Sequence, residues 1–293
     1  MRFVEDFFDY ELIDASDGER LERWGKTILI RPDPQIIWKG ERNNKLWNNA
    51  DARYIRSNSG GGHWEMYKNV PQVWSIKYND LTFRLKPMGF KHTGLFPEQA
   101  VNWKLVKKII KSSGRSNIKA LNLFAYTGAA TIAALSEGAS VTHVDASKGM
   151  VQWAKENAVA SNLSDCPVRW LVDDCIKFVK REIRRGNKYD IIIMDPPSYG
   201  RGPDGEIWKF ENQLAELLEL TSEVFSDNPL LLLINSYTTG MSPTIMNYMT
   251  EQIFSRKHDG VVSTDEIGLK VTNKEIVLPC GSTTIWRAKN LNV

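Results

Sequence analysis

Cysteine is scarce in this chain of 293 residues, which has only Cys166, Cys175 and Cys280. Three thiols at irregular spacing argue against a disulfide framework and a zinc site, and they favour a reducing compartment. No apolar run approaches the ~18 residues of a membrane-spanning helix, and residues 1–14 carry acids within their apolar stretch, unlike a signal peptide. We therefore expect a cytoplasmic protein with no membrane partner and no metal.

A large charge of one sign is also lacking, because 38 Lys and Arg stand against 35 Asp and Glu. The charge is nevertheless divided: residues 1–38 hold nine acids and five Lys or Arg, whereas residues 39–91 hold four acids and ten Lys or Arg. Five tryptophans lie within residues 1–90, at Trp24, Trp38, Trp47, Trp64 and Trp74. Basic residues among aromatics suit a phosphate-rich, base-stacking partner such as RNA. Alternatively, the tryptophans build a core and the basic residues line a solvated rim.

Two kinds of pattern divide the chain near residue 90. Residues 1–90 show short β-type runs broken by Pro, Asn and Gly, which predicts a small β-rich domain. Residues 91–293 alternate helical and strand patterns, which predicts a doubly wound, mostly parallel α/β sheet. Two final β-type runs joined by "LPCGS" predict an antiparallel element at the edge of that sheet.

The ends of the predicted strands carry the chemistry, because ligands of open α/β sheets bind outside the carboxyl ends. Four strands end in a glycine turn or in acids, at Gly128, Asp145, Asp173-Asp174 and Asp195-Pro196-Pro197. The turn "NLFAYTGAA" is not the G-x-G-x-x-G of NAD and FAD sites, which counts against a bound pyrophosphate. Asp145 can accept both hydroxyls of a ribose, or it can cap the next helix, for which Ser147 is the other candidate.

At this point the sequence resembles class I S-adenosylmethionine-dependent methyltransferases over about residues 90–290. The resemblance rests on "KHTGLFPEQAVNW", "LNLFAYTGAATIAALSEGASVTHVDAS", "DDCIKFVKREIRRGNKYDIIIMDPPSY" and "LLLINSYTTG". It is nearest to the bacterial 23S ribosomal-RNA large-subunit methyltransferases that carry a small β-rich domain ahead of the catalytic one. The resemblance implies a seven-stranded Rossmann-like sheet, S-adenosylmethionine as cofactor and ribosomal RNA as substrate.

The resemblance also implies where the cofactor binds. Phe96 and Gln99 would flank its methionine end, and the wall under its sulfonium would consist of Phe124, Ala125, Tyr126, Thr127 and Gly128. Asp145, followed by Ala146, would hold the ribose. Of Asp173 and Asp174, one can cap the following helix while the other accepts from adenine, and the resemblance assigns the adenine to Asp174.

The resemblance places Asp195 at the edge where the cofactor and the methyl acceptor meet, so Asp195 is also a predicted cofactor-binding residue, and the stretch that follows, to Tyr199, would meet the acceptor. Relatives with an (Asp/Asn)-Pro-Pro-aromatic loop commonly methylate planar nitrogen, so Asp195, Pro196, Pro197 and Tyr199 are the predicted catalytic residues. The acid and the proline-held carbonyls would accept from an amine, and the tyrosine would stack on the base. Ser198 is extra here, which puts the reach of Tyr199 in question, and a plain turn with Tyr199 in the core is the alternative. The glycines that follow predict a flap.

Cytosine-5 methylation is disfavoured, because it needs a cysteine thiolate and the fifth strand runs into Asn235-Ser236-Tyr237 instead. Asn235 and Tyr237 could bind a base edge or could simply end a strand. Basic stretches at residues 99–119 and 177–188 contact RNA or form solvated helix faces. A protein or small-molecule methyltransferase, and a non-catalytic RNA-binding protein, remain the rival functions.

Overall fold

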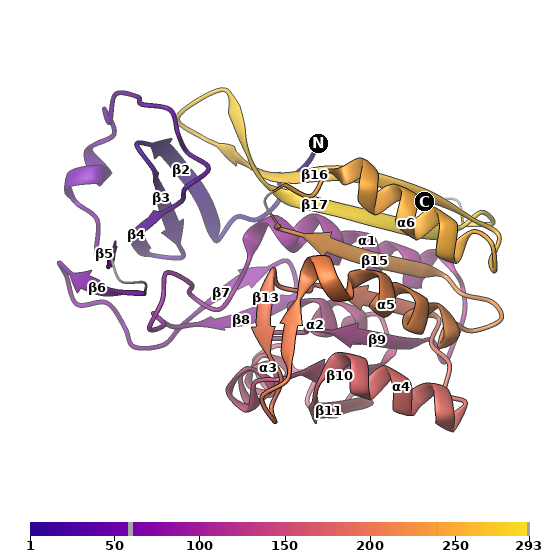
Figure 1. Cartoon of the computed structure of the whole chain (residues 1–293). Helices are drawn as coiled ribbons and strands as arrows, with labels where there is room; N and C mark the ends of the chain where they lie inside the picture. The colour runs from indigo at the N-terminus through magenta and orange to yellow at the C-terminus, as the bar shows by residue number, and fades with distance from the viewer. Residues whose placement is uncertain (58–60, 239, 292–293) are drawn as a thin grey trace. The chain divides into compact units, whose positions relative to one another are not determined.

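The computed structural model describes residues 1–57, 61–238 and 240–291, and Figure 1 shows its elements. The chain falls into two compact units. The α/β unit consists of Met1–Arg2, Val101–Ile267 and Cys280–Val293, and the β-rich unit consists of Phe3–Ala100 and Gly268–Pro279. The long strands β16 (Gly260–Val271) and β17 (Ile276–Ala288) therefore contribute residues to both units.

The α/β unit alternates strands and helices along the chain. Ahead of β16 its strands are β9 (Lys119–Leu123), β10 (Ser140–Asp145), β11 (Val168–Val172), β12 (Ile191–Met194), β13 (Tyr199–Arg201), β14 (Ile207–Lys209) and β15 (Leu231–Ser236). Its helices are α1 (Ala100–Ser112), α2 (Ala129–Ser136), α3 (Lys148–Ala160), α4 (Cys175–Arg185), α5 (Phe210–Glu223) and α6 (Pro243–Phe254). Local chemistry sets these limits: α3 starts at the Ser147 cap, and α4 ends at Gly186, which is left-handed.

The strands of this unit follow the order β11-β10-β9-β12-β15-β17-β16. The first five strands in this order, β11, β10, β9, β12 and β15, pair in parallel, and β17 runs antiparallel to β15. Strands β12 and β15 are buried along their whole length, as expected where helices cover both faces of a parallel sheet. Helices α4, α5 and α6 lie side by side, and α2 packs beside α3 (Figure 1). The predicted α/β class with a mostly parallel sheet is thus confirmed.

The predicted turn at "LPCGS" is wrong. Residues 272–275 form the turn between β16 and β17, and "LPCGS" lies inside β17. Gly281 is there because β15 comes close: a Cβ on Gly281 would stand 2.8 Å from the Ser236 carbonyl oxygen. A glycine inside a strand can mark such a close backbone approach rather than a turn.

The β-rich unit is built from short strands. They are β1 (Arg2–Val4, whose first residue belongs to the other unit), β2 (Tyr10–Ser16), β3 (Glu19–Trp24), β4 (Thr27–Pro32), β5 (Ala52–Arg56), β6 (Gly62–Met66), β7 (Trp74–Tyr78) and β8 (Leu81–Leu85), with 3-10 turns η1 (Lys45–Asn48) and η2 (Pro97–Gln99). Strands β2, β3 and β4 form an antiparallel meander, β4 pairs with β5 in parallel, and β7 pairs with β8 separately.

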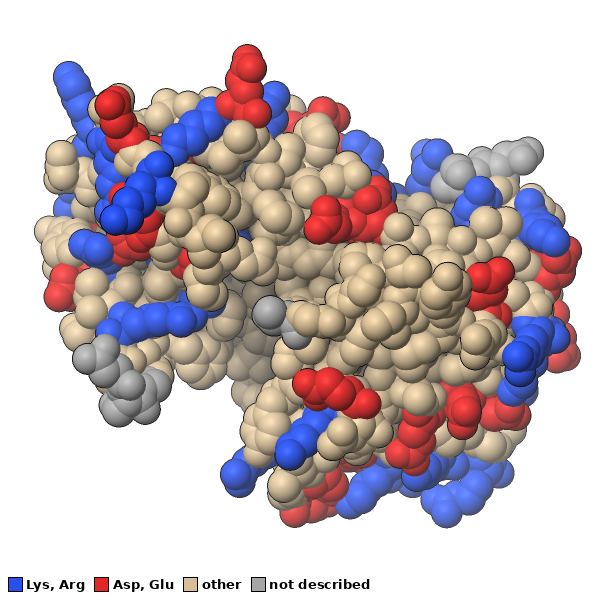
Figure 2. All heavy atoms as spheres, turned by 45° about the horizontal axis from the view of Figure 1, so that its top comes forward, with Lys and Arg blue, Asp and Glu red and all other residues tan. Residues whose placement is uncertain are grey.

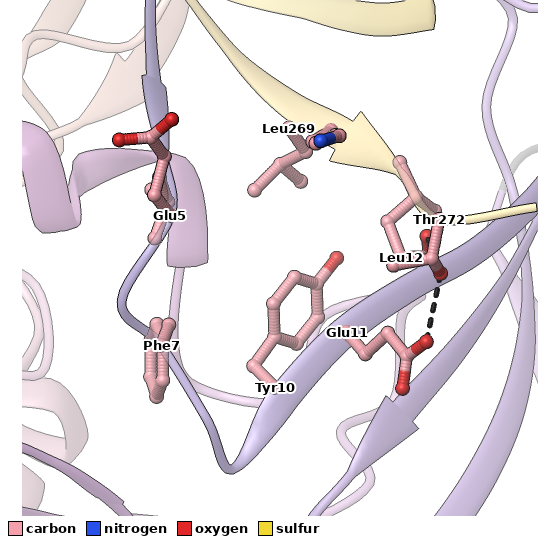
Figure 3. A pocket seen from close by; sticks show the side chains of 9 residues that line it. Glu5, Phe7, Tyr10, Glu11, Leu12, Leu269 and Thr272 are labelled. Carbon is pink, nitrogen blue, oxygen red and sulfur yellow. Dashed lines mark hydrogen bonds between the residues drawn. The ribbon is translucent and has the colours of Figure 1, made fainter. Parts of the chain in front are cut away.

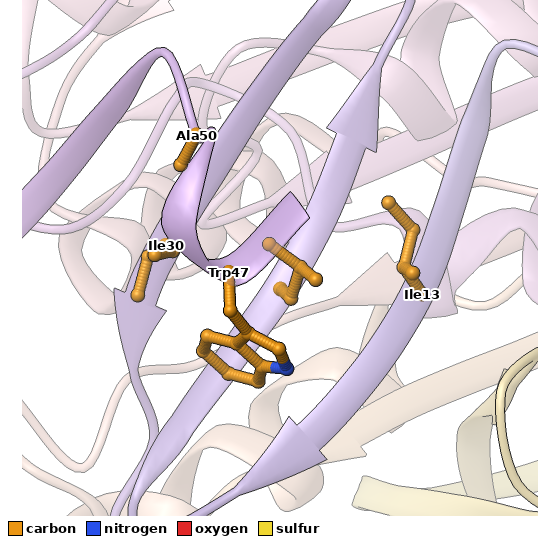
Figure 4. Close-up of a cluster of buried hydrophobic side chains, with 5 residues drawn as sticks. Ile13, Ile30, Trp47 and Ala50 are labelled. Atoms are coloured by element: carbon orange, nitrogen blue, oxygen red, sulfur yellow. The ribbon is translucent and has the colours of Figure 1, made fainter. Parts of the chain in front are cut away.

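The tryptophans of this unit serve its packing. Trp24 is fully buried, and Trp47 joins a buried cluster with Ile13, Leu21, Ile30 and Ala50 (Figure 4). The indole nitrogens of the half-buried Trp38, Trp64 and Trp74 donate to backbone carbonyls. All five side chains are therefore built into the unit rather than held out as stacking platforms.

A small pocket of about 200 Å³ lies where the end of β16 meets β2 (Figure 3). Val271 pairs with Leu12, and the Thr272 hydroxyl donates to the Glu11 carboxylate at 2.7 Å. These bonds secure the end of the long hairpin within the β-rich unit. In the part of the chain that the structure describes, no helix is long and apolar enough to cross a membrane, and no group of three or more His, Cys, Asp or Glu could hold a metal ion.

Candidate active site

The strand order reverses between β9 and β12, so the crevice expected to bind ligands lies at their carboxyl ends. Residues 124–128, which we call the cofactor turn, follow β9 there. Phe124, Tyr126 and Gly128 have φ values of +53°, +51° and +81°. Positive φ is costly for bulky residues and concentrates at functional sites. The turn is therefore held in a demanding shape by the structure around it.

Gly128 is required by close packing as well as by its φ. A Cβ at this position would stand 2.8 Å from Ala154 Cβ and 3.4 Å from His143 Cε1. Next to it, the buried Asn157 donates its side-chain N–H to the Thr127 carbonyl at 2.8 Å. Helix α3 therefore lies directly under the turn, and no larger residue fits between them.

Buried polar groups support the turn from inside the unit. Asn122 donates to the Thr131 hydroxyl at 2.9 Å, and that hydroxyl shares a hydrogen bond of 3.0 Å with His143 Nδ1. Burial lowers the pKa of His143 to about 3, so its ring is neutral at pH 7. The three side chains connect β9, α2 and β10 and fix the direction in which the cofactor turn leaves the sheet.

Asp145 ends β10 and ties the cofactor turn to the next loop. One carboxylate oxygen accepts from the Tyr126 backbone N–H at 2.8 Å, and the other accepts from the Ser147 N–H at 2.8 Å. Ser147 caps α3 through Met150, as predicted. Burial raises the pKa of Asp145, and the two N–H bonds oppose that shift. A carboxylate has about four lone-pair sites, so acceptor capacity for two ribose hydroxyls remains and the site fits a ribose.

The two acids after β11 have different partners. Asp174 caps α4, because one of its oxygens accepts from the Lys177 backbone N–H at 2.9 Å. Asp173 forms an ion pair with Arg181. The cap leaves the second carboxylate oxygen of Asp174 as the group that would accept from adenine.

The loop after β12 is joined to the cofactor turn by Trp208 of β14. The indole N–H of Trp208 donates to the Pro197 carbonyl at 2.5 Å, and its ring centroid lies 4.9 Å from that of Phe124. The Asp195 backbone N–H donates to the carbonyl of Leu123, the last residue of β9, at 3.3 Å. Sequence reasoning missed Trp208; the alternation in "EIWK", which is typical of a strand, was the available signal.

Tyr199 is not in the core. It opens the β13–β14 hairpin, pairs with Lys209 and exposes 53% of its surface. Gly200 lets this hairpin lie against the loop, since a Cβ there would be 3.3 Å from Pro197 Cγ. Ser198, the extra residue, shares a 2.9 Å hydrogen bond with the Thr238 hydroxyl. The hairpin therefore holds the loop and leaves the tyrosine ring open to a ligand.

Phe96 and Gln99 belong to the β-rich unit. Phe96 precedes η2, with its ring centroid 5.2 Å from that of His92, and Gln99 is buried. Burial, with nearby Arg and Lys charges, lowers the pKa of His92 to about 3. His92 is therefore neutral at pH 7, and its ring packs against that of Phe96.

The end of β15 is structural. Asn235 is 2% exposed, and its side-chain oxygen accepts from Asn102 at 3.0 Å and from Thr283 at 2.8 Å. The buried Cys175 thiol accepts from the Phe124 backbone N–H at 3.4 Å, and burial raises its pKa. Asn235 thus supports the strand rather than a base edge, and Cys175 is held as a thiol, which does not suit cytosine-5 chemistry.

Most basic residues of α4 have partners within the chain. Ion pairs join Lys177 to Glu206, Lys180 to Glu216, Arg181 to Asp173 and Arg185 to Glu182. Basic and acidic side chains are also interspersed over the face drawn in Figure 2. The run at residues 177–188 therefore reads as a paired, solvated helix face rather than as an RNA contact.

A parallel α/β sheet with a glycine turn, an acid that fits a ribose and a proline loop at its switch point is typical of enzymes that bind a nucleoside cofactor. The chain matches the family of S-adenosylmethionine-dependent methyltransferases over residues 49–248 and belongs to it. It is therefore a transferase, and its cofactor is S-adenosylmethionine.

Solved structures and curated relatives agree with this membership. The S-adenosylmethionine-dependent methyltransferase of Agrobacterium tumefaciens is 35% identical, with a TM-score of 0.93 over 98% of this chain and 93% of that one. The "Ribosomal RNA large subunit methyltransferase K/L" proteins of Shewanella frigidimarina and Colwellia psychrerythraea are 35% and 32% identical over 53% and 60% of this chain. The matches cover only 21% and 22% of those two relatives, so the chain spans about a fifth of their length.

Proposed function

We propose that this protein methylates a base nitrogen of ribosomal RNA. The names of the curated relatives support an RNA substrate in the ribosomal large subunit. In this proposal residues 91–293 are the catalytic domain, and its sheet comprises seven strands in the order β11-β10-β9-β12-β15-β17-β16. Residues 1–90 help to dock the RNA. A ribosomal substrate also agrees with a cytoplasmic protein.

The predicted cofactor residues form the binding part of this proposal. Asp145 would accept the ribose hydroxyls, with Ala146 beside it. The second oxygen of Asp174 would accept from the adenine, with Asp173 next to it and paired to Arg181, and the cofactor turn would support the reactive centre. Phe96 and Gln99 would contact the methionine end. When bound, S-adenosylmethionine supplies an electrophilic methyl group. What remains for the chain is to align a nitrogen lone pair with the bond to that methyl group.

Asp195, Pro196 and Tyr199 would perform that alignment. Because the Pro197 carbonyl already accepts from Trp208, the Pro196 carbonyl and the Asp195 carboxylate are the groups that would accept from an amine on the base. Two such acceptors turn the amine so that its lone pair points away from them. The exposed Tyr199 ring would stack on the base and hold its plane.

The link made by Trp208 is the observation that carries the proposal. It joins the Pro197 carbonyl to the Phe124 ring, so the acceptor loop and the cofactor turn are fixed relative to one another. Trp208 is a positioning residue in this scheme. A loop that served only as a strand end would not need a buried indole to hold it against the cofactor turn.

The test uses S-adenosylmethionine labelled on its methyl group, with ribosomal RNA and, separately, protein extract from cells that lack the gene. Label in one ribosomal RNA, recovered in an N-methylated nucleoside after digestion, is expected. Asp195→Asn should lose transfer yet keep cofactor binding, while Asp204→Asn, an exposed acid of the neighbouring hairpin, should behave as wild type. Label in protein alone would refute the RNA substrate, and a C5-methylated cytosine would refute the nitrogen acceptor.

A further inference from the structure

The β-rich unit has an arginine-lined pocket that the proposed chemistry does not use. Its volume is about 640 Å³, and it opens beside the β2–β3 turn and the ends of β4 and β5. The residues that line it are Asp17, Glu19, Pro32, Arg42, Arg53, Tyr54, Ile55 and Arg56. Three guanidinium groups thus face two carboxylates around one opening, which leaves an excess of positive charge.

Arg42 and Arg53 are both held in place by Glu19. The two oxygens of the nearly buried Glu19 accept from Arg42 at 2.9 Å and from Arg53 at 2.8 Å. The Arg42 guanidinium also lies over the Trp47 ring, 4.1 Å from its centroid. Each guanidinium has five N–H donors in a fixed fork. Arg42 also donates to the Ser16 carbonyl at 2.9 Å and pairs with Asp17 at 3.9 Å. The single bond of Arg53 to Glu19 leaves most of the Arg53 donors for an anion that enters the pocket.

Arg56 extends the basic character of the opening. Its side chain is exposed, and within the described residues no ion pair of Arg56 is found. Lys91 lies close enough to respond to it: burial lowers the pKa of Lys91 to about 8, the Asp33 charge opposes that shift, and the charges of Arg20, Arg31 and Arg56 add to it. The electrostatic environment beside the pocket is therefore positive.

An exposed aromatic residue, Phe90, lies on a segment that is bonded to the lining of the pocket. The Tyr54 hydroxyl donates to the Gly89 carbonyl at 3.3 Å, and Lys91 Nζ donates to the Pro32 carbonyl at 3.2 Å. Tyr54 and Pro32 both line the pocket, so the chain on either side of Phe90 is anchored to it. Phe90 itself exposes 51% of its surface. Its ring meets that of His92 edge to face, with the centroids 6.0 Å apart, and the exposed part of the ring is available for stacking.

We infer that this pocket binds single-stranded RNA, with Arg42, Arg53 and Arg56 on a backbone phosphate and Phe90 stacked on an adjacent base. The inference rests on the proposed RNA substrate and gives the β-rich unit a defined share in binding it. Phosphate-binding arginines beside an aromatic platform are the combination that single-strand binders use. An acidic peptide would satisfy the arginines but would leave the exposed ring without a partner.

The test measures binding of a fluorescein-labelled oligouridylate of about ten nucleotides, a length within the range of single-strand sites, to the full chain. Arg56→Ala should weaken binding roughly fivefold and lower the slope of log affinity against log salt by about 0.7, the value for one phosphate of a single strand. Phe90→Ala should weaken it roughly 5- to 150-fold with the salt slope unchanged. Lys77→Ala, which removes an exposed lysine away from the pocket, is the control and should match wild type.

Methyl transfer separates the two proposals. If wild type labels ribosomal RNA and the Arg56 and Phe90 variants raise the KM for RNA, both stand. If wild type labels ribosomal RNA while both variants bind and react like Lys77→Ala, the pocket is an internal ion-pair network and this inference alone fails. If wild type neither binds the oligouridylate nor labels RNA but labels protein, the proposed substrate fails and the docking role fails with it.

Discussion

Gly128→Ala is the perturbation that tests the cofactor turn most directly. The new methyl group would be 2.8 Å from Ala154 Cβ, closer than real Cβ atoms approach one another, and its neighbours in α3 belong to a helix that cannot easily move. The residue also has a φ of +81°, which costs an L-residue about 1–2 kcal/mol. Overpacking of a tight site adds roughly 1–3 kcal/mol. We therefore expect a loss of roughly 2–5 kcal/mol in the free energy of unfolding.

Gly138 provides a matched control within the same unit. It follows α2 with the same φ of +81°, yet a Cβ at Gly138 would meet no atom within 4 Å. Gly138→Ala should therefore cost only the backbone term of about 1–2 kcal/mol. The difference between the two variants isolates the close approach of α3 to the turn from the conformational preference of glycine.

Urea unfolding and calorimetric titration with S-adenosylmethionine provide the two measurements. Displacement of the turn at Gly128 should weaken cofactor binding roughly tenfold, equivalent to about 1.4 kcal/mol, whereas Gly138→Ala should leave the affinity unchanged. Equal losses of stability in the two variants would show that the packing against α3 is not limiting. Unchanged cofactor affinity in a folded Gly128→Ala protein would remove the turn from the binding site.

Three further outcomes follow from individual contacts. Trp208→Phe keeps the ring but removes the donor to Pro197, so kcat should fall roughly tenfold while the cofactor Kd stays within about twofold of wild type; an unchanged kcat would refute the positioning role. His143 has a folded pKa of about 3 against about 6.5 when unfolded, so the unfolded chain binds more protons between these values. Acidification from pH 7 to 5 should therefore cost about 2 kcal/mol through His143, in addition to the loss through His92, and urea titrations of His143→Gln should show a loss smaller by that amount. Arg31→Met leaves the buried Glu22 carboxylate without its cation and should cost about 3–5 kcal/mol, and a second change of Glu22→Gln should recover part of it.

Local signals made much of the α/β unit predictable. Ser147 and Gly186 mark the start of α3 and the end of α4 because a cap hydroxyl and a left-handed glycine act on neighbouring residues. The run Ile191–Met194 predicts a strand covered on both faces, because burial on both faces needs apolar residues at every position. Such features require no knowledge of distant contacts.

Features that depend on distant partners were not predictable. Gly281 resembles a turn glycine until β15 is placed beside it, and the basic run of α4 resembles an RNA surface until Glu206 and Glu216 are brought alongside. Trp208 gains its role from two contacts, one with the strand end at Pro197 and one with the cofactor turn that precedes it by some eighty residues. A sequence pattern reports periodicity and caps, and it does not report which separated residues meet.

Asp145 shows why a structural and a functional role need not be alternatives. The sequence raised a choice between ribose binding and helix capping, and Ser147 takes the cap. The carboxylate nevertheless has structural work, since it accepts from Tyr126 in the cofactor turn and from Ser147 in the next loop. Each bond uses one lone pair of one oxygen. The two bonds together oppose the rise in pKa that burial causes in this acid. A carboxylate held by neighbouring backbone N–H groups would lose little further freedom on accepting two hydroxyl groups, so in the proposed function the bonds that shape the turn would also prepare Asp145 for a ribose.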